Sequence, residues 1–388
     1  MSGPAILHHR VIPAAASETY SPNQSVDFHL QVPGRKVING SVRIEGTVLV
    51  VDSAGKPVDE TDNVKIDAFV GAHSFLAQMS TEVESRGLIE QLQNYPRYVS
   101  VASKASMSQD DTLSLKMQAE LRCGGKSDNG KYCLQRVADR SNTGTGTPTI
   151  ADAQDPSFSM KPMCAINRAS GNDYSFDRLG FMRISMILAQ SRDALFGFDA
   201  ATGATATPLG CTYTLSNLAI RFSTVPEDGS TAPMLCRSYF STTNSISSTS
   251  SSLVSRVPST RVNGVSVIFV KQDDARGVDT NSQELQMVPQ FESTEFLFAS
   301  SVSGGIEYRI TDAGEAVQRG IDSLSSTGHS NVSVQTLQGN DAYVLGMQFD
   351  SYLDLSRELF SQRLVLNSTT ITTDPLNSQS FFHALLEL

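Results

Sequence analysis

Residues 180–190, GFMRISMILAQ, alternate between apolar and polar side chains over most of their length. Met182, Ile184, Met186 and Leu188 share one parity, which places them on one face of an extended chain. An α-helix would instead need its apolar residues three or four positions apart. Alternation with a period of two is typical of an antiparallel strand that buries one face against a core and exposes the other. The segment therefore predicts a β-strand.

The same period recurs along the whole chain, and it predicts about a dozen strands. The clearest further segments are Val26–Val32, Val42–Ile44, Val48–Val50, Val64–Val70, Leu113–Leu121, Val265–Phe269, Ile306–Ile310 and Tyr343–Phe349. Long polar loops of uneven length separate them, and no regular strand–helix–strand repeat is visible. This argues against a Rossmann-type sheet and favours an all-β sandwich or jelly roll.

One of the predicted strands changes phase in its middle. Tyr213 and Leu215 alternate on one parity, whereas Leu218, Ile220 and Phe222 alternate on the other. A single extra residue in a strand restores the buried face after such a slip. The pattern therefore predicts a β-bulge near residues 216–217.

Helices are expected to be few and short. The best helical candidates are Ser80–Asn94, Asp312–Leu324 and Leu355–Arg363. The second has apolar residues at helical spacing, but Gly314 and Gly320 weaken it because glycine lowers helix propensity.

The length of 388 residues favours two β-rich units, either a double jelly roll or one jelly roll with an added β domain. We expect an N-terminal arm over 1–22, a first unit over 23–237, a Ser/Thr-rich junction over 238–262 and a second unit over 263–388. The junction could instead be an exposed edge strand and loop inside one domain. The arm could strap onto a neighbouring copy or be disordered.

Charge and composition limit the kinds of partner. Apolar residues make up 39% and charged residues 18% of the chain, and the formal net charge is −10. A protein that grips phosphates should carry a basic patch or arm, but the N-terminus offers only Arg10 beside two histidines. We therefore expect no direct contact with a genome. We expect neither a secretory signal nor a membrane span, because no apolar run approaches the roughly 18 residues that a span needs.

No motif predicts catalysis, a cofactor or a metal. Gly124–Ser127 reads GGKS, but the first glycine of a phosphate-binding loop is replaced by Glu120. Adjacent acidic pairs at 110–111 and 273–274 point to opposite faces of a strand, so they do not form an acid/base pair. The histidines are not at metal-ligand spacing, and neither are the five cysteines, for which reduced thiols are expected. These are His8, His9, His29, His73, His329, His383, Cys123, Cys133, Cys164, Cys211 and Cys236. Catalytic, cofactor-binding and metal-binding residues are therefore all predicted to be none, and the chain is not expected to be an enzyme.

A resemblance to a known family is carried by the order of several segments. They are FHLQVP (28–33), SVRIEGTVLVVD (41–52), residues 71–98, FSMKPMCAIN (158–167), residues 180–190, YTLSNLAIRF (213–222) and the tail 343–368. In this order the chain resembles the jelly-roll capsid proteins of the adenovirus-like and tailless-phage lineage, which includes virophages and polinton-like viruses. The resemblance implies a shell protein without catalytic residues. In that lineage the major capsid protein carries two jelly rolls and forms trimers, whereas the penton protein at the vertex forms pentamers.

The resulting hypothesis is a structural capsid protein that assembles into the icosahedral shell of a virus, as major capsid or penton protein. Its partners would be other copies of itself and neighbouring capsid proteins, with an internal membrane or minor capsid proteins as further candidates, and no small-molecule substrate. Its location would be the virion, assembled inside the host cell. The alternatives are a spike or glycan-attachment protein of β-sandwich type and an enzyme on a β scaffold.

Overall fold

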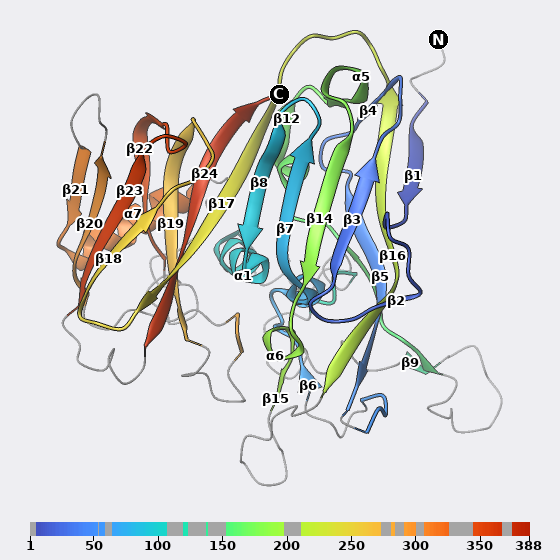
Figure 1. Ribbon diagram of the computed structural model, residues 1–388, viewed down its shortest axis with the longest axis horizontal. Helices are drawn as coiled ribbons and strands as arrows, with labels where there is room; N and C mark the ends of the chain where they lie inside the picture. Colours follow the sequence, from blue (N-terminus) through green and yellow to red (C-terminus); the bar gives the residue numbers. More distant parts are fainter. Residues whose placement is uncertain are drawn as a thin grey trace. The chain divides into compact units, whose positions relative to one another are not determined.

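The computed structural model of the chain is built mainly of β-strands, with few and short helices (Figure 1). It describes residues 5–52, 54–58, 64–106, 119–122, 137–138, 153–197, 211–272, 281–283, 291–299, 306–325, 344–366 and 375–388. The chain divides into two compact units. Unit 1 comprises residues 1–88, 108–234 and 278–282, and unit 2 comprises residues 89–107, 235–277 and 283–388.

Unit 1 contains two main sheets. The first has the order β11-β5-β16-β4-β13, and β1 and β2 also pair with β16. Its strands are β1 (Leu7–Val11), β2 (Thr19–Tyr20), β4 (Arg35–Val37), β5 (Arg43–Val51), β11 (Ser157–Met160), β13 (Tyr174–Ser175) and β16 (Thr212–Pro226). In the second sheet, β14 (Met182–Leu188) lies between β3 (Ser25–Leu30) and β7 (Leu76–Val83), antiparallel to both. The apolar parity of the longer strands is buried, as in Val26, Phe28 and Leu30 of β3.

Short elements complete unit 1. Two small antiparallel pairs are β6 (Val64–Lys65) with β15 (Phe196–Gly197), and β9 (Val137–Ala138) with β10 (Ala153–Gln154). The remaining elements are η1 (Gly71–Phe75), η3 (Ala165–Arg168), β12 (Ala169–Gly171), α5 (Phe176–Leu179) and α6 (Ser191–Ala194). Strand β8 (Gly87–Gln93) contains the division between the units.

Unit 2 also has two sheets. One has the order β22-β19-β24-β17, formed by β17 (Met234–Ile246), β19 (Val262–Lys271), β22 (Leu345–Leu353) and β24 (Leu376–Glu387), and β17 also has a parallel neighbour in β8. The other has the order β18-β23-β20-β21, formed by β18 (Ser250–Ser255), β20 (Phe291–Ala299), β21 (Ile306–Ile310) and β23 (Leu359–Leu366). A single cluster of buried apolar side chains, including Phe269, Phe360 and Phe382, joins residues of both sheets.

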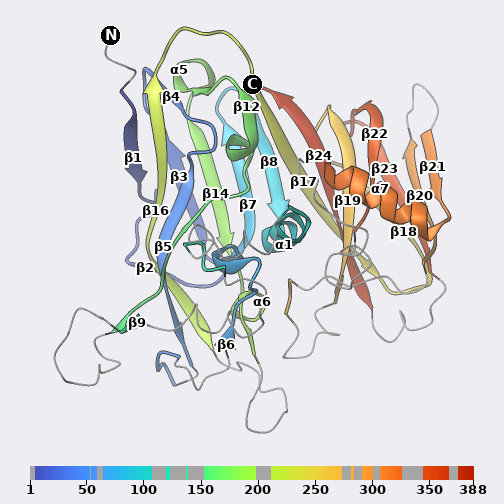
Figure 2. The same ribbon diagram turned by 180° about the vertical axis from the view of Figure 1, so that it is seen from behind.

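The described residues of unit 2 include two helices, α1 (Tyr95–Ser106) and α7 (Ala313–Ser325). Helix α7 contacts β22 and β19 (Figure 2). Gly320 permits this approach, since a Cβ atom there would lie 2.4 Å from the carbonyl oxygen of Val344. The glycine that weakens the helix locally is therefore explained by packing.

Most of the strand predictions within the described residues are confirmed. The predicted bulge is also confirmed, because the pairing of β16 with β5 shifts register between Ser216 and Ala219, where Asn217 has a φ of 54°. The two apolar parities of β16 are both buried as a result. The helix predicted at Asp312–Leu324 is confirmed as α7.

Two helix predictions are wrong. Ser80–Asn94 forms the second half of β7 and all of β8, which are separated by a turn at 84–86 and by Gly87 with a φ of 71°. Leu355–Arg363 begins as a turn and continues as β23, in which Phe360, Gln362 and Leu364 are buried in alternation. In both places the period-two pattern of burial prevails over local helix propensity.

Other differences concern strand extent. From the predicted strand Val64–Val70, only Val64–Lys65 is a strand, and the chain then turns into η1. Of Leu113–Leu121, residues 113–118 lie outside the described ranges and 119–121 form a turn. Residues 238–262, the proposed junction, contain most of β17, all of β18 and the first residue of β19. The first part of the predicted arm, Leu7–Val11, pairs with β16 of its own chain.

Candidate functional site

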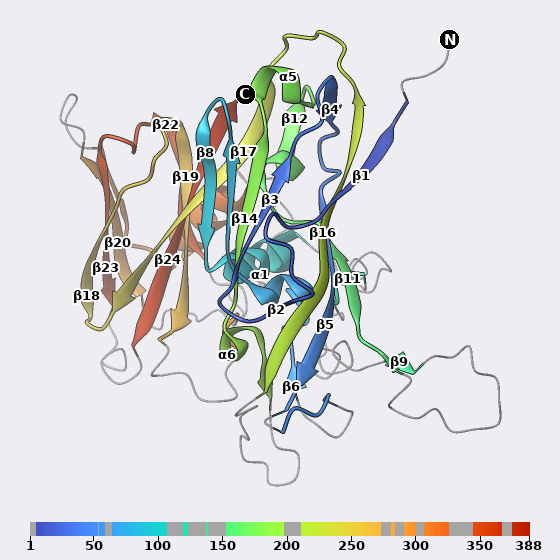
Figure 3. The same cartoon turned by 45° about the vertical axis from the view of Figure 1, so that its right-hand side comes forward.

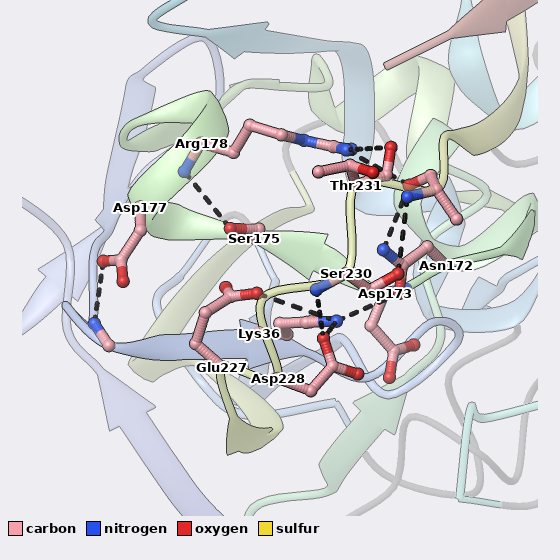
Figure 4. Close-up of polar contacts among 12 residues, drawn as sticks. Lys36, Asn172, Asp173, Ser175, Asp177, Arg178, Glu227, Asp228, Ser230 and Thr231 are labelled. Atoms are coloured by element: carbon pink, nitrogen blue, oxygen red, sulfur yellow. Dashed lines mark hydrogen bonds and ion pairs between the residues drawn. The ribbon is translucent and has the colours of Figure 1, made fainter.

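A polar cluster lies in unit 1 where β4, α5 and the loop after β16 meet (Figure 4). At its centre is Lys36, whose side chain is only 2% exposed. The ammonium group contacts a carboxylate oxygen of Asp228, lies 3.7 Å from Oε1 of Glu227 and donates a hydrogen bond of 3.1 Å to Oδ1 of Asn172. A buried ammonium group is costly unless it is paired and hydrogen-bonded, and here it has both kinds of partner.

Further hydrogen bonds hold the same segments together. Arg178 of α5 donates from Nη1 to the carbonyl oxygens of Thr231 and Ala232, each at 3.1 Å. Asp177 accepts a bond of 2.8 Å from the backbone N–H of Gly34, and Asp173 accepts one of 3.0 Å from that of Asn39. The cluster therefore fixes the shape of neighbouring loops.

The electrostatics of the cluster agree with a holding role. The hydrogen bond from Lys36 is the main cause that lowers the pKa of Asp228, and backbone N–H groups add to it. Asp228 is ionised at neutral pH, and its negative charge compensates the positive charge of Lys36. The buried ammonium group of Lys36 is paired with side chains of the same unit. The loop residues around Asp228 face solvent. The cluster therefore holds this solvent-facing loop against β4.

A second charged cluster is buried inside unit 1. Oε2 of Glu120 lies 3.5 Å from Nε2 of His73 and 3.1 Å from Nε of Arg122. Its Oε1 accepts a hydrogen bond of 3.0 Å from the backbone N–H of Lys161. All three ionisable side chains of the cluster are less than 5% exposed. The short segment 119–122 is thereby held against η1 and the chain that follows β11.

Burial and pairing act in opposite directions on Glu120. Burial raises the pKa of this carboxyl group, but the hydrogen bond from His73 and the charge of Arg122 outweigh it and lower the pKa from 4.5 to about 2. For His73, burial is the largest cause and lowers the pKa below 6.5, so the imidazole is neutral at pH 7. Glu120 therefore remains ionised and His73 remains neutral in the folded protein.

We predict that acid destabilises unit 1 through this cluster. The folded protein holds both groups in their deprotonated forms more strongly than the unfolded chain does, so protons favour unfolding. Stability should begin to fall as the pH drops below about 6.5, where His73 becomes protonated in the unfolded chain. It should fall further between 4.5 and about 2, where the carboxylate of Glu120 is protonated in the unfolded chain but still ionised in the folded protein. The Glu120 step is worth roughly 3 kcal/mol. Urea unfolding at a series of pH values measures it, and equal stability at pH 7 and pH 4 would contradict the prediction.

Unit 2 contains a buried polar chain that the sequence did not reveal. The Oγ of Ser266 on β19 lies 3.0 Å from Nε2 of His383 on β24 and 3.1 Å from the Oγ of Ser323 on α7. Each of these residues is at most 3% exposed. A serine–histidine pair could suggest a nucleophile, but a buried pair has no access for a substrate. These hydrogen-bonded side chains instead connect α7 to β19 and β24.

The other residues singled out in the sequence are dispersed. His8 and His9 lie on β1, where they hydrogen-bond to Ser223 and Thr224, and His29 lies on β3. Outside the described residues are Gly124–Ser127, both acidic pairs, Cys123, Cys133 and His329. Within the described residues, Cys164, Cys211 and Cys236 form no disulfide bond. Within the described ranges, no group of three or more His, Cys, Asp or Glu residues could hold a metal, and no helix is long and apolar enough to cross a membrane.

Comparison with known proteins gives matches of structure only. No protein-family model matches the sequence, and no curated protein matches it. The Faustovirus major capsid protein matches with a TM-score of 0.58 at 10% identity, covering 100% of this chain and 91% of that chain. PBCV-1 VP54, fitted into a reconstruction of the virophage Sputnik, gives 0.56 at 10%, covering 100% and 95%. The mavirus major capsid protein gives 0.52 at 8%, covering 98% and 90%.

These likenesses extend over nearly the whole chain, through both units. The predicted all-β class is confirmed, and the chain has the jelly-roll fold found in these viral capsid proteins.

Proposed function

We propose that this chain is a major capsid protein, a building block of an icosahedral virus shell that works by assembly. The observation that carries the proposal is the match of both units together, at TM-scores above 0.5, with proteins that are themselves major capsid proteins. A vertex protein with one jelly roll and an added domain would resemble such proteins over one unit only. The facet-forming role is therefore favoured over the penton role.

The physical character of the chain supports a structural role. The charged clusters around Lys36 and Glu120 are closed by protein partners, so they stabilise loops and do not present reactive groups. Sandwiches with rigid cores can carry different contacts on their loops without disturbing the fold. We infer that the partners are other copies of this chain and neighbouring capsid proteins, and that the protein resides in the virion.

Trimers are the proposed capsomer. Three copies would bring six sandwich units around one axis, which approximates a hexagon and can tile a flat facet. Such an obligate assembly would bury more than about 2,000 Å² at each interface.

Electron microscopy of the purified protein tests this proposal. We expect class averages with three-fold symmetry and a roughly hexagonal outline. Five-fold averages would replace the facet role by the vertex role. Isolated single chains at every protein concentration would overturn the capsid proposal itself.

A further inference from the structure

Three arginines lie side by side on the outer face of the first sheet of unit 1. Arg10 on β1 is paired in register with Arg221 on β16, and Arg221 is paired with Arg43 on β5. Figure 3 shows these strands following one another across the sheet. Arg10 is exposed, the Arg221 side chain is 59% exposed, and Arg43 is half-buried. Neighbouring strands bring such directly opposed side chains within about 5 Å of each other at their Cβ atoms.

This arginine row is only partly neutralised by its own unit. Glu45 on β5 lies 2.7 Å from the Nε of Arg221. Arg43 donates to the carbonyl oxygen of Ser159 at 2.7 Å, and Arg10 donates to that of Asn217 at 3.4 Å, so both meet neutral acceptors in these bonds. Like charges directly opposite each other destabilise a sheet. The row therefore costs the isolated chain stability and leaves an excess of positive charge facing outward.

The second sheet of unit 1 carries the opposite excess on its outer face. Arg183 on β14 lies 3.2 Å from Oδ1 of Asp27 on β3 and 3.4 Å from Oε2 of Glu82 on β7. Two carboxylates thus surround one guanidinium group, and the three side chains are 29–40% exposed. In the arginine row the proportion is reversed, with three arginines and one carboxylate, that of Glu45, which pairs with Arg221. The two outer faces of one sandwich are therefore complementary in charge.

We propose that the arginine row of one copy docks against the Asp27/Glu82 face of a second copy. This inference rests on the proposed capsid function and adds the surfaces that meet. A contact between two different faces of the same chain is heterologous, the type that closes into rings or continues across a lattice. A second copy is favoured over nucleic acid or a membrane, because the chain has 40 acidic against 30 basic residues and would be repelled by a phosphate surface.

Inverting each face while keeping its internal ion pairs tests the contact. The first variant carries Arg10→Glu, Arg43→Glu and Arg221→Glu together with Glu45→Lys. The second carries Asp27→Lys, Arg183→Glu and Glu82→Lys. A third combines all seven changes. The control exchanges the exposed pair Glu315 and Arg319 of α7, whose charged atoms lie 3.6 Å apart. Circular dichroism confirms that each variant is folded.

Self-association is measured by sedimentation at 50 to 500 mM salt. We expect each single-face inversion to raise the concentration needed for half-association at least about tenfold at low salt, because like charges would then meet. The variant with all seven substitutions should associate as the wild type does, because both faces are inverted and opposite charges meet again. The control variant should also match the wild type. High salt should reduce these differences.

Other results would overturn the inference in distinguishable ways. If the first variant associates as the wild type does, this contact is overturned and the capsid function still stands. The same conclusion follows if the variant with all seven substitutions fails to associate. Unchanged association with lost binding to phosphatidylserine vesicles or single-stranded DNA would assign the row to an anionic membrane or nucleic acid instead. A wild-type chain that never associates would overturn both the contact and the proposed function.

Discussion

Replacing Glu120 with glutamine is expected to lower the free energy of unfolding by about 3–5 kcal/mol. The change removes the carboxylate that faces Arg122 at 3.1 Å, and the guanidinium group is then left buried without its charge partner. It also weakens the hydrogen bond from the backbone of Lys161. Urea unfolding followed by circular dichroism at pH 7 measures the loss.

A matched control is available on the surface of the same unit. Glu82 pairs with Arg183 at 3.4 Å, but its side chain is 40% exposed, so Glu82→Gln should cost less than about 1 kcal/mol. A double variant, Glu120→Leu with Arg122→Met, should be more stable than Glu120→Gln because no unpaired charge remains. Equal losses for Glu120→Gln and Glu82→Gln would show that the buried cluster does not hold segment 119–122.

Replacing Phe382 with alanine is expected to cost about 3–5 kcal/mol in unit 2. Phe382 is fully buried on β24 and meets the ring of Phe360 edge-to-face, with centroids 5.4 Å apart. Strand β24 is paired on both sides, to β17 and to β19, so the backbone has little freedom to close the cavity. Thermal and urea unfolding measure the effect.

The exposed residue Val254 provides the comparison for this core position. It is 51% exposed on β18, and Val254→Ala should change stability by less than about 0.5 kcal/mol. The loss at Phe382 should also be smaller for Phe382→Leu, because more of the cavity remains filled. If Phe382→Ala costs no more than Val254→Ala, the apolar cluster around Phe360 does not form the core of unit 2.

Much of the fold could be predicted because β-strands leave a local signature. The parity change between Leu215 and Leu218 was sufficient to place the bulge of β16. At 80–94 the signature was weaker, since apolar, polar and small residues mix around the turn. The decisive feature there was the left-handed conformation of Gly87, which a helix interior does not allow.

The polar clusters could not be predicted from sequence in the same way. Lys36 and Asp228 are 192 positions apart, and His73 and Glu120 are 47 apart, so no spacing motif connects them. In the sequence, Glu120 is notable only because it stands where a phosphate-binding loop needs its first glycine. The arginine row likewise required the registers of β1, β16 and β5, which a single sequence does not contain.

The most direct test of the capsid assignment is the absolute mass of the purified protein, measured by size-exclusion chromatography with light scattering. The proposed function predicts a trimer, with three times the mass of one chain, over a wide range of protein concentration. A chain that remains a monomer at every concentration and salt tested would contradict it.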